Sequence, residues 1–504
     1  MNEAKLETSI VLSELKELSE AGDAFVAGGP VRDWLIGRRC RDIDLVFGKE
    51  AIKKASVFAG RTKGHLVPLD LDEGVARIIL PGIVFDFSQF RQGAVSIRED
   101  LKKRDFTMNA LAMPLESALP ILQAVVEDNE VDIRGGIKRG NSRRFSIIDP
   151  TEGIADLERG IIRAISLGNF YDDPLRPIRA YRFRAQLGFD IEEGTIRWIG
   201  AVKGRVPTVS PERISYELGL IMETGRAADT LSEMLGAGLL FELFPELYEM
   251  SGVEQPGFHH LDVLGHSLEA LRAVEELITD PCLKFFLCGP LTGWIAANPV
   301  KVQHLKWAVL FHDAGKPSCK GERDQRVTFY HHDEKGACLI SGIGNRLRWP
   351  RRAVEFASGL IGLHMRPFHL LNDLRRGGPS LRAMRRLIMD IKADYPALFL
   401  LSMADSIAGC GPLKPQELDL ELACLWEKVH GFYAETLTPI RQKRRFLTGH
   451  DIIAELGLSS GPIIGRALDA VEEAQLEGLV RSREEAVSFL SEWLKTGVSD
   501  VPES

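Results

Sequence analysis

Hydrophobic residues recur at two different spacings in the first third of the chain. Residues 5–20 place Leu, Ile and Val at helical spacing among Glu and Lys, which predicts an amphipathic helix. A second helix is predicted at 31–36, directly after a pair of glycines. Short apolar runs predict strands at 23–27, 43–47, 75–80 and 83–87, the last two as a hairpin around Pro81-Gly82. Together these elements predict a small α+β domain with a mixed or antiparallel sheet.

From Pro150 onward the pattern becomes almost entirely helical. Apolar residues recur every three or four positions over 170–187, which predicts helical structure there. Residues 210–212, Ser-Pro-Glu, have the order of a helix start: a hydroxyl cap, proline in the first turn, then an acid. Residues 255–440 are predicted to be helical as well. The expected fold class is therefore α+β, a small head followed by an all-α neck, body and tail.

The 504 residues are too many for one hydrophobic core. Joints rich in Gly and Pro lie near 145–150, 251–257 and 409–415. The predicted domains are a head at 1–146, a neck at 147–250, a body at 251–440 and a tail at 441–504.

Composition narrows the class of protein. With 45% hydrophobic and 27% charged residues, the chain has the composition of a globular protein. The seven cysteines show no CxxC pair and no regular spacing, so we expect reduced thiols and a cytoplasmic protein without a disulfide framework or zinc ribbon. The N-terminus lacks a signal-peptide pattern, and the most apolar stretch, 285–300, is too short to span a bilayer. No membrane partner is expected.

The net charge of −8 argues against general nucleic-acid binding, although a local basic stripe can bind RNA by itself. The candidate stripe is Arg176, Arg179, Arg182 and Arg184.

The densest candidate chemistry lies between the first two predicted strands. Gly28 and Gly29 separate a strand from a helix, where glycines let phosphates approach the backbone N–H groups. Arg32 follows and offers a charged fork for a triphosphate. The pattern indicates a phosphate-binding turn.

Two carboxylates follow with one residue between them. Asp42 and Asp44 are one residue apart on a predicted strand, so both point to the same face, where two hard anions suit Mg²⁺. Asp86, on another predicted strand, is a third candidate. Asp42, Asp44 and Asp86 are thus the expected catalytic carboxylates. A glycine turn followed by ordinary surface aspartates is the alternative, which the ordered combination over seventeen residues disfavours.

These strings resemble the first signature of class II tRNA nucleotidyltransferases, the family of CCA-adding enzymes and bacterial poly(A) polymerases. Residues 100–110, DLKKRDFTMNA, resemble the second signature, which handles the ribose and triphosphate in that family. Residues 149–157 resemble the third, a hinge; 172–183 the fourth, which reads the base; and 210–218 the fifth, a structural helix. The matches cover 25–220 in family order.

The resemblance implies roles for individual residues. Asp173 would accept from an exocyclic amine and Arg176 would donate to a ring nitrogen or carbonyl, so the pair can read C or A without a template. Lys103 stands where arginine is usual and keeps the charge without the bidentate geometry, and Asp172 replaces the usual Glu. The implied nucleotide-binding residues are Gly28, Gly29, Arg32, Lys103, Arg104, Asp105, Asn109, Asp173, Arg176 and Arg179.

A second constellation follows in the predicted body. Its order is His, His-Asp, His, His, Asp, and such ligands suit Mn²⁺, Fe²⁺, Ni²⁺ or Mg²⁺. The order resembles the HD superfamily of metal-dependent phosphohydrolases, which is fused to many bacterial CCA-adding enzymes and acts on 2′,3′-cyclic and phosphorylated ends. A structural relic is the alternative. The implied metal ligands are His266, His312, Asp313, His332, His364 and Asp405.

The resemblance implies template-independent nucleotide addition to tRNA 3′ ends from CTP or ATP, with release of pyrophosphate. CCA-adding relatives carry a flexible loop of a dozen or more residues before the second signature, whereas here only 92–99 intervene. This short segment resembles the CC-adding branch, so we expect addition of C and poor addition of A. The alternative is full CCA addition, with a shortened but working loop or with its role moved to 119–146.

Two rival functions remain open. One is a bacterial poly(A) polymerase, which shares all five signatures. The other is an RNA-repair HD phosphohydrolase whose head merely binds RNA, and the predicted Mg²⁺ carboxylates Asp42 and Asp44 argue against it. The tail at 441–504 resembles the helical, RNA-facing module of the family. The sequence does not fix the oligomeric state.

Overall fold

The computed structural model describes residues 3–128, 146–255, 257–323, 326–391, 394–443, 446–476 and 478–496. The chain forms two compact units, one made of 1–221 with 233–243, the other of 222–232 with 244–504. The division passes through helix α12 (Ala227–Gly236). The finer division into head, neck, body and tail stays a prediction.

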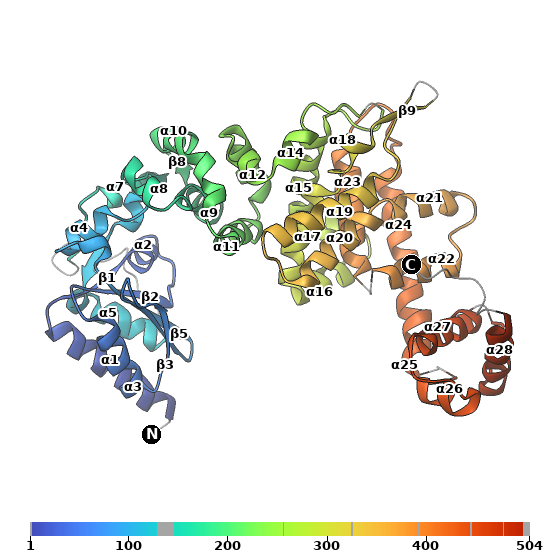
Figure 1. The fold of residues 1–504 in the computed structure, drawn as a ribbon, viewed down its shortest axis with the longest axis horizontal. Helices are drawn as coiled ribbons and strands as arrows, with labels where there is room; N and C mark the ends of the chain where they lie inside the picture. The colour runs from blue at the N-terminus through green and yellow to red at the C-terminus, as the bar shows by residue number, and fades with distance from the viewer. Residues whose placement is uncertain are drawn as a thin grey trace. The chain divides into compact units, whose positions relative to one another are not determined.

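The first unit begins with a six-stranded mixed sheet and its helices (Figure 1). Its elements are α1 (Glu3–Glu20), β1 (Ala24–Ala27), α2 (Gly29–Leu35), β2 (Asp42–Phe47), α3 (Ala51–Thr62), β3 (His65–Asp70), β4 (Val75–Leu80), β5 (Ile83–Gln89), η1 (Arg91–Gly93), α4 (Ile97–Lys102), η2 (Thr107–Asn109), β6 (Ala112–Pro114) and α5 (Leu115–Val126).

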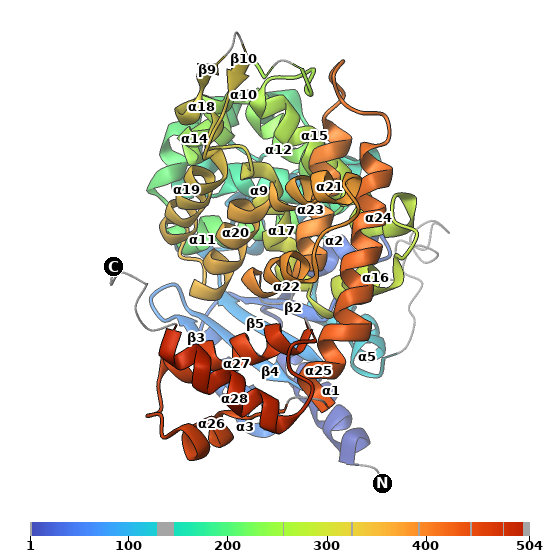
Figure 2. The same ribbon diagram turned by 90° about the vertical axis from the view of Figure 1, so that its right-hand side faces the viewer.

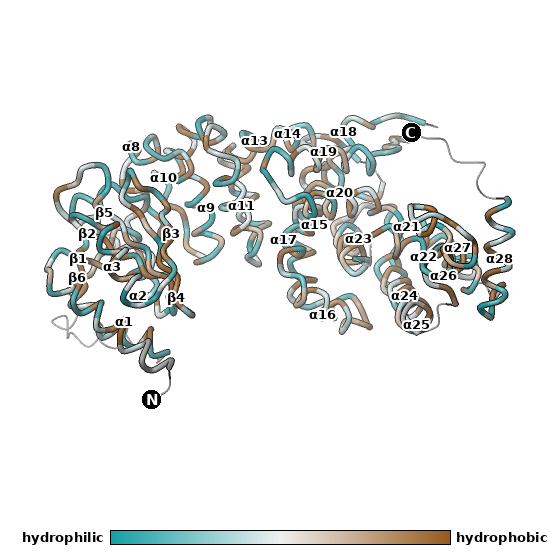
Figure 3. The backbone as a smooth tube through the Cα atoms, turned by 60° about the horizontal axis from the view of Figure 1, so that its bottom comes forward, coloured by the Kyte–Doolittle hydropathy of each residue, from teal (hydrophilic) through white to brown (hydrophobic). Residues whose placement is uncertain are grey.

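The strand order is β3-β4-β5-β2-β1-β6, with β2 and β5 parallel and the other neighbours antiparallel. Helices α1, α3 and α5 pack together against the sheet (Figure 1). The colours alternate along α1 in Figure 3, as expected for an amphipathic helix, and its Val11 and Leu15 are buried. The rings of Phe47 and Phe87, 5.2 Å apart, lie in the core between sheet and helices.

The rest of the first unit is largely helical. Its elements are α7 (Gly153–Arg159), β7 (Ile161–Ile162), α8 (Leu167–Asp172), α9 (Arg176–Leu187), β8 (Asp190–Ile191), α10 (Glu193–Val202), η3 (Lys203–Thr208), α11 (Pro211–Met222), the end of α12 and α13 (Leu239–Leu243).

The stretch 170–187 is helical as predicted, with a break near its start that the spacing does not show. Helix α8 ends at Asp172, α9 begins at Arg176, and Asp173 is extended, with φ −137° and ψ 96°. Pro174 causes the break, because a proline disfavours the helical conformation of the residue before it. The break places Asp173 and Arg176 at the junction of two helices.

The second unit is a helical body followed by the tail. Its elements are α14 (Pro245–Met250), α15 (Val263–Thr279), η4 (Pro281–Leu283), α16 (Gly289–Ala297), α17 (Pro299–Phe311), α18 (Lys316–Cys319), β9 (Gly321–Arg323), β10 (Arg326–Thr328), α19 (His332–Arg346), α20 (Arg351–Leu363), α21 (Arg366–Arg375), α22 (Leu381–Asp390), α23 (Tyr395–Ala408), α24 (Leu418–Gly431), η5 (Phe432–Leu437), α25 (Thr438–Lys443), α26 (Gly449–Leu456), α27 (Pro462–Leu476) and α28 (Arg483–Thr496).

Two details of this unit differ from the predictions. The β9–β10 hairpin interrupts the stretch predicted to be helical, because the β-branched Val327 and Thr328 favour strands there. Cys282 and Cys288 form a disulfide, so the prediction of free thiols throughout is wrong for this pair. The 3₁₀ turn η4 folds the chain back after Cys282, which brings the two Cα atoms to 5.1 Å despite a spacing without a CxxC motif.

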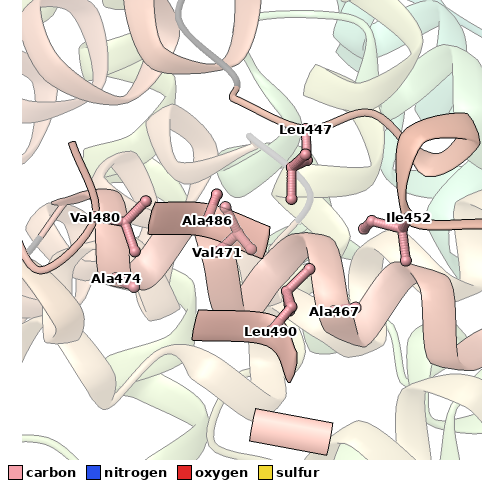
Figure 4. Close-up of a cluster of buried hydrophobic side chains, with 8 residues drawn as sticks. All are labelled: Leu447, Ile452, Ala467, Val471, Ala474, Val480, Ala486 and Leu490. Carbon is pink, nitrogen blue, oxygen red and sulfur yellow. The ribbon is translucent and has the colours of Figure 1, made fainter. Parts of the chain in front are cut away.

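The tail helices α26, α27 and α28 lie together and enclose a small core of their own (Figures 1, 2 and 4). Thr448 and Asp451 form a capping box that starts α26. The core residues are Leu447, Ile452, Ala467, Val471, Ala474, Val480, Ala486 and Leu490. Among the described residues, no helix combines the length and the apolar character needed to cross a bilayer.

Two candidate active sites

A cavity of about 540 Å³ lies in the first unit, where the sheet meets α9 and α11. Seven arginines and four carboxylates line it, a formal excess of three positive charges that suits a triphosphate. The charged residues are Arg32, Arg77, Arg91, Arg104, Arg176, Arg179, Arg182, Asp44, Asp105, Asp173 and Glu217. Gly28, Gly29, Asn109, Phe183, Gln186 and Tyr216 complete the lining.

Gly28 caps α2 in a conformation that only glycine adopts easily, with φ +81°. A Cβ atom at this position would lie 2.5 Å from Nη1 of Arg104 and 3.5 Å from Oδ2 of Asp44. The glycine therefore lets an arginine and a carboxylate meet at the floor of the cavity.

A network of hydrogen bonds joins the predicted nucleotide-binding residues. Arg32 Nη1 donates to Asn109 Oδ1 over 2.8 Å, and Asn109 Nδ2 donates to Asp105 Oδ1 over 3.0 Å. Arg179 Nη2 donates to Asp105 Oδ2 over 2.7 Å. Burial alone raises the pKa of Asp105, but Arg179 and Asn109 outweigh it and hold that pKa below its usual range. The network fixes an ionised carboxylate at the cavity wall.

The three predicted catalytic carboxylates occupy different settings. Asp44 and Asp86 are partners in register across the parallel strands β2 and β5, and Asp42 is exposed two residue pairs away. Asp86 accepts two hydrogen bonds of 2.8 Å from Arg77. Burial raises the pKa of Asp44 to about 6.

These carboxylates do not converge as the residues of a prebuilt metal site do. Among the described residues, the groups in which three ligand atoms lie within 4.8 Å of one another are both in the second unit. Asp44 lines the cavity, whereas Asp42 and Asp86 do not. The first unit thus offers carboxylates that a bound ion would have to gather.

The two predicted base-reading residues lie at the junction of α8 and α9. Asp173 Oδ2 accepts from Arg213 Nη2 over 2.9 Å, and its Oδ1 accepts from the backbone N–H of Leu175 over 3.2 Å. Arg176 donates from Nη2 to the carbonyl of Lys103 over 2.9 Å and from Nη1 to the carbonyl of Arg104 over 3.2 Å. Hydrogen bonds to neighbouring parts of the chain therefore hold both side chains in place.

Lys103 lies outside the cavity lining, unlike the other predicted nucleotide-binding residues. Its Nζ donates to the carbonyl of Gln92 over 2.6 Å. Gln92 belongs to residues 90–96, a short connection between β5 and α4. The alternative was that residues 119–146 take over the role of the family's loop. Helix α5 ends within this stretch, at Val126. Residues 129–145 lie outside the described residues.

The arginines of the proposed RNA-binding stripe are engaged inside the unit. Arg182 Nε lies 2.9 Å from Glu217 Oε2, Arg179 pairs with Asp105, and Arg184 pairs with Glu233. The sequence pattern shows the positive charges but not the acids that meet them. RNA binding by these arginines stays a prediction, with an acid beside three of the four.

The second unit holds a cluster of histidines and aspartates. His266 on α15 places Nε2 3.0 Å from Asp405 Oδ1 and 3.3 Å from His312 Nε2. His312 Nε2 lies 3.2 Å from Asp313 Oδ2. These four residues form one half of the cluster.

Asp313 also belongs to the other half. Its Oδ1 lies 3.5 Å from His332 Nε2 and 4.0 Å from His364 Nε2, and those two Nε2 atoms are 3.2 Å apart. One carboxylate therefore faces two sets of histidines, one with each oxygen. The structure brings all six predicted ligands of this unit together.

Backbone carbonyls orient three of the four histidines. The Nδ1 atoms of His312, His332 and His364 lie 2.8, 2.8 and 2.6 Å from the carbonyls of residues 309, 329 and 361. A protonated Nδ1 leaves Nε2 with its lone pair toward the cluster, as in histidine metal sites. Burial lowers the pKa of His364 to about 4, which keeps its imidazole neutral.

A cavity of about 840 Å³ opens onto this cluster. Lys316, which donates to Asp313 Oδ2 over 2.6 Å, and His259, whose Nδ1 lies 3.3 Å from Nδ1 of His266, both line it. Its other lining residues include Phe258, Phe329, Tyr330, Phe368, Arg375 and Lys414. The cavity joins a metal-ligand cluster to aromatic and cationic walls.

Comparison with known proteins identifies the family. The chain matches the poly A polymerase head domain over residues 24–163, the probable RNA and SrmB-binding site of polymerase A over 188–250, and the HD domain over 263–395. An A-adding tRNA nucleotidyltransferase of Deinococcus radiodurans is 31% identical over 477 residues, covering 93% of this chain and 95% of the relative. This chain belongs to the tRNA nucleotidyltransferase family.

Other relatives carry a different name within this family. A CC-adding tRNA nucleotidyltransferase of Thermus thermophilus is 31% identical over 481 residues, covering 94% of each chain. The Thermotoga maritima CCA-adding enzyme, solved in complex with tRNA, is similar at a TM-score of 0.56 and 21% identity, covering 98% of this chain and 96% of its own. The likeness confirms the predicted fold of this nucleotidyltransferase, a mixed-sheet head followed by helices, and the HD match confirms the predicted fusion.

The sequence patterns miss several lining residues of the nucleotidyltransferase cavity. Arg77 could have been found, because it and Asp86 are equally far from the turn at Pro81-Gly82 and so face each other in a hairpin. In the cavity of the second unit, the missed lining residue is Lys316. It could have been found, because it follows Asp313 by three residues, a spacing that puts two side chains on one face of a helix. No comparable signal points to Tyr216 or Phe183, which only the tertiary fold brings to the nucleotidyltransferase cavity.

Proposed function

We propose that this nucleotidyltransferase adds cytidine from CTP to the 3′ end of tRNA without a template and releases pyrophosphate. The observation that carries the proposal is the cavity of the first unit, where an excess of arginines adjoins the Asp173–Arg176 pair and Asp44. Positive charge suits the triphosphate, and the carboxylate and guanidinium suit the hydrogen-bonding edge of cytosine. A cytoplasmic location is part of the same proposal.

The chain's own residues would bind and orient the reactants. Arg32 and Arg104 line the cavity near Gly28 and would hold the triphosphate. Asp42 and Asp44 fit Mg²⁺, since they share one face of β2, and the ion would activate the primer 3′-hydroxyl and stabilise the departing pyrophosphate. Asp86 fits an ion less well than they do, because Arg77 already occupies both of its oxygens.

The 90–96 connection favours CC addition over the alternatives. It contains no room for the long flexible loop of CCA-adding enzymes, which is thought to reshape the base pocket from C to A. Relatives at 31% identity carry the names CC-adding and A-adding, so identity alone does not choose between them. Full CCA addition, A addition alone and poly(A) synthesis are the competing activities.

The deciding experiment supplies tRNAs that end at the discriminator base, at C or at CC, with CTP or ATP in turn. We expect C to be added to the first two and little A to the third. A addition on CC ends at a rate comparable to C addition would overturn CC specificity and indicate CCA addition. A addition without C addition would indicate an A-adding enzyme, and long A runs a poly(A) polymerase.

A second candidate function is metal-dependent phosphohydrolysis at the HD cluster. The observation that favours it is the convergence of two ligand groups that share Asp313. His266, His312 and Asp405 would hold one divalent ion with Asp313, and His332 and His364 a second one. Imidazole and carboxylate donors suit Mn²⁺, Ni²⁺, Fe²⁺ or Mg²⁺, and such ions would supply an activated water and neutralise phosphate charge.

Hydrolysis of 2′,3′-cyclic AMP in Mn²⁺, Ni²⁺ and Mg²⁺ tests this second function. We expect activity in wild-type protein and none after His312→Ala or Asp313→Ala, with C addition retained. Equal hydrolysis by wild type and both variants would refute the assignment. If the protein hydrolysed the ester but incorporated neither CTP nor ATP, the RNA-repair alternative would replace the first proposal.

A further inference from the structure

The short connection between β5 and α4 is held in an unusual backbone conformation. Gln92 has φ 49° and ψ 44°, the left-handed region that non-glycine residues rarely occupy. Such a residue persists only where its surroundings hold it. The contacts around the connection therefore show what fixes it.

The helix α4 and the turn after it clasp the connection at two points. Asp100, fully buried, accepts from the backbone N–H of Arg91 over 2.9 Å. Lys103 Nζ donates to the carbonyl of Gln92 over 2.6 Å and lies 3.4 Å from that of Arg91. An ammonium that meets two carbonyls is a strong, compact clamp.

The same Lys103 is joined on its other side to the base-reading arginine. Arg176 Nη2 donates to the backbone carbonyl of Lys103, and Nη1 donates to that of Arg104. Lys103 thus links Gln92, which its ammonium contacts, to Arg176, which its backbone carbonyl contacts. The connection and the base-reading residue share one anchor.

This anchor limits how the base-reading pair can move. Arg176 cannot shift without leaving the carbonyls of residues 103 and 104, and Asp173 is held by Arg213 and by the start of α9. Accepting adenine in place of cytosine requires the donors and acceptors of the pair to change position, because the two bases present different edges. The clamped turn opposes that change.

We propose that Lys103 is a positioning residue that holds Arg176 in one base-reading arrangement and so restricts the enzyme to cytosine. The inference rests on the proposed nucleotidyltransferase function. Lys103 acts through the turn at residues 103–104 and not through contact with the nucleotide, since it does not line the cavity. The lysine that stands at the family's arginine position would thus act by positioning Arg176.

The test compares kcat/KM for C addition to tRNA ending at the discriminator with kcat/KM for A addition to tRNA ending in CC. Lys103→Met removes the ammonium and keeps the chain length, and Lys103→Arg restores a cationic donor. Lys102→Met is the matched control, because Lys102 is an exposed lysine next to Lys103 in the sequence. Gln92→Gly loosens the same connection by a second route, since glycine accepts positive φ.

We expect Lys103→Met to lower the C-to-A ratio about tenfold or more, the scale of one hydrogen bond to a charged group. Gln92→Gly should lower it less, Lys103→Arg should restore most of it, and Lys102→Met should leave it unchanged. The readout is a ratio of two nucleotides, which a general loss of folding would not move in one direction.

Three results would overturn the inference. An equal rise in KM for CTP and ATP in Lys103→Met, with an unchanged ratio, would mean that Lys103 binds the triphosphate directly. An unchanged ratio in both Lys103→Met and Gln92→Gly would mean that the connection does not restrain Arg176. Wild-type protein that adds neither nucleotide would overturn the proposed function and this inference with it.

Discussion

The two candidate centres of this protein are built in opposite ways. In the HD cluster, six side chains from five segments of the second unit point their donor atoms at one another, and Asp313 faces two sets of histidines. In the first unit, Asp44 lines the nucleotidyltransferase cavity without Asp42 or Asp86, Arg77 holds Asp86, and arginines dominate the lining. The HD cluster is arranged to bind metal cations, whereas the nucleotidyltransferase cavity is arranged to bind an anion.

The difference indicates where each centre obtains its metal. Buried histidines and aspartates that already converge offer low-cost binding to a resident ion. The nucleotidyltransferase cavity complements the triphosphate itself, so its Mg²⁺ is expected to arrive with the nucleotide and to draw Asp42 and Asp44 together. The same chain would then keep one metal centre between reactions and assemble the other in each turnover.

The largest expected effect comes from Asp42→Ala or Asp44→Ala. Either change should reduce CTP incorporation by a factor of about a thousand or more, because such electrostatic sites stabilise the transition state by several kcal/mol. The measurement is single-turnover C addition in excess Mg²⁺. Hydrolysis of 2′,3′-cyclic AMP serves as the control and should not change. Near-wild-type incorporation by either variant would remove the metal assignment.

The shared carboxylate of the HD cluster provides the next test. Asp313→Ala should abolish phosphohydrolysis and release the ions of both halves, whereas His364→Ala should weaken mainly the half that it shares with His332. Metal content measured after reconstitution with Mn²⁺ separates the two outcomes. Equal losses in the two variants would contradict a bridging role for Asp313.

A third prediction concerns the stability cost of the nucleotidyltransferase carboxylate. Burial raises the pKa of Asp44 from 3.8 to about 6. Above pH 6 the folded protein therefore carries an ionised Asp44 at a cost in free energy that the unfolded chain does not have. Asp44→Asn should therefore raise the free energy of unfolding at pH 7.5 by about 1–2 kcal/mol. The gain should vanish as pH falls from 6 to below 4, where the carboxyl is neutral in both states.

Chemical denaturation across that pH range, without Mg²⁺, is the measurement. Asp42→Asn is the control, because Asp42 is exposed and should gain little. A destabilised Asp44→Asn protein at pH 7.5 would show that the charge of Asp44 is favourable in the folded state, against the pKa shift.

The smallest expected effect belongs to Asp86. Because Arg77 occupies both of its oxygens, Asp86→Asn should act by misplacing Arg77 over the cavity and raise KM for CTP about three- to tenfold, with kcat little changed. Arg77→Lys should give a similar profile. A kcat loss as large as that of Asp44→Ala would instead make Asp86 a catalytic metal ligand.

Sequence reasoning reached the fold class because strand and helix spacings differ clearly in this chain. It identified Asp44, Arg104 and the histidines because their spacing in motifs carries the chemistry, and the structure brings them to two cavities. Whether they act as assigned stays a prediction.

The misses share a physical cause. The pairing of Arg182 with Glu217, the second role of Asp313 and the clamp of Lys103 on Gln92 all depend on contacts between residues far apart along the chain or on backbone geometry. Periodicity and motif spacing report which face a residue occupies, not which partner meets it there. The break at Asp173 has a different cause. Pro174 is a sequence signal for it, but the helical spacing of apolar residues continues across the break.

The contrast between the two centres requires that the HD centre hold its metal by itself and that the nucleotidyltransferase centre not do so. The test loads wild type, Asp44→Ala and Asp313→Ala with Mn²⁺, removes free ions by gel filtration and counts the ions per chain. We expect two retained ions in wild type and in Asp44→Ala and fewer than one in Asp313→Ala, in accord with the two groups that share Asp313. Loss of ions in Asp44→Ala with full retention in Asp313→Ala would contradict it.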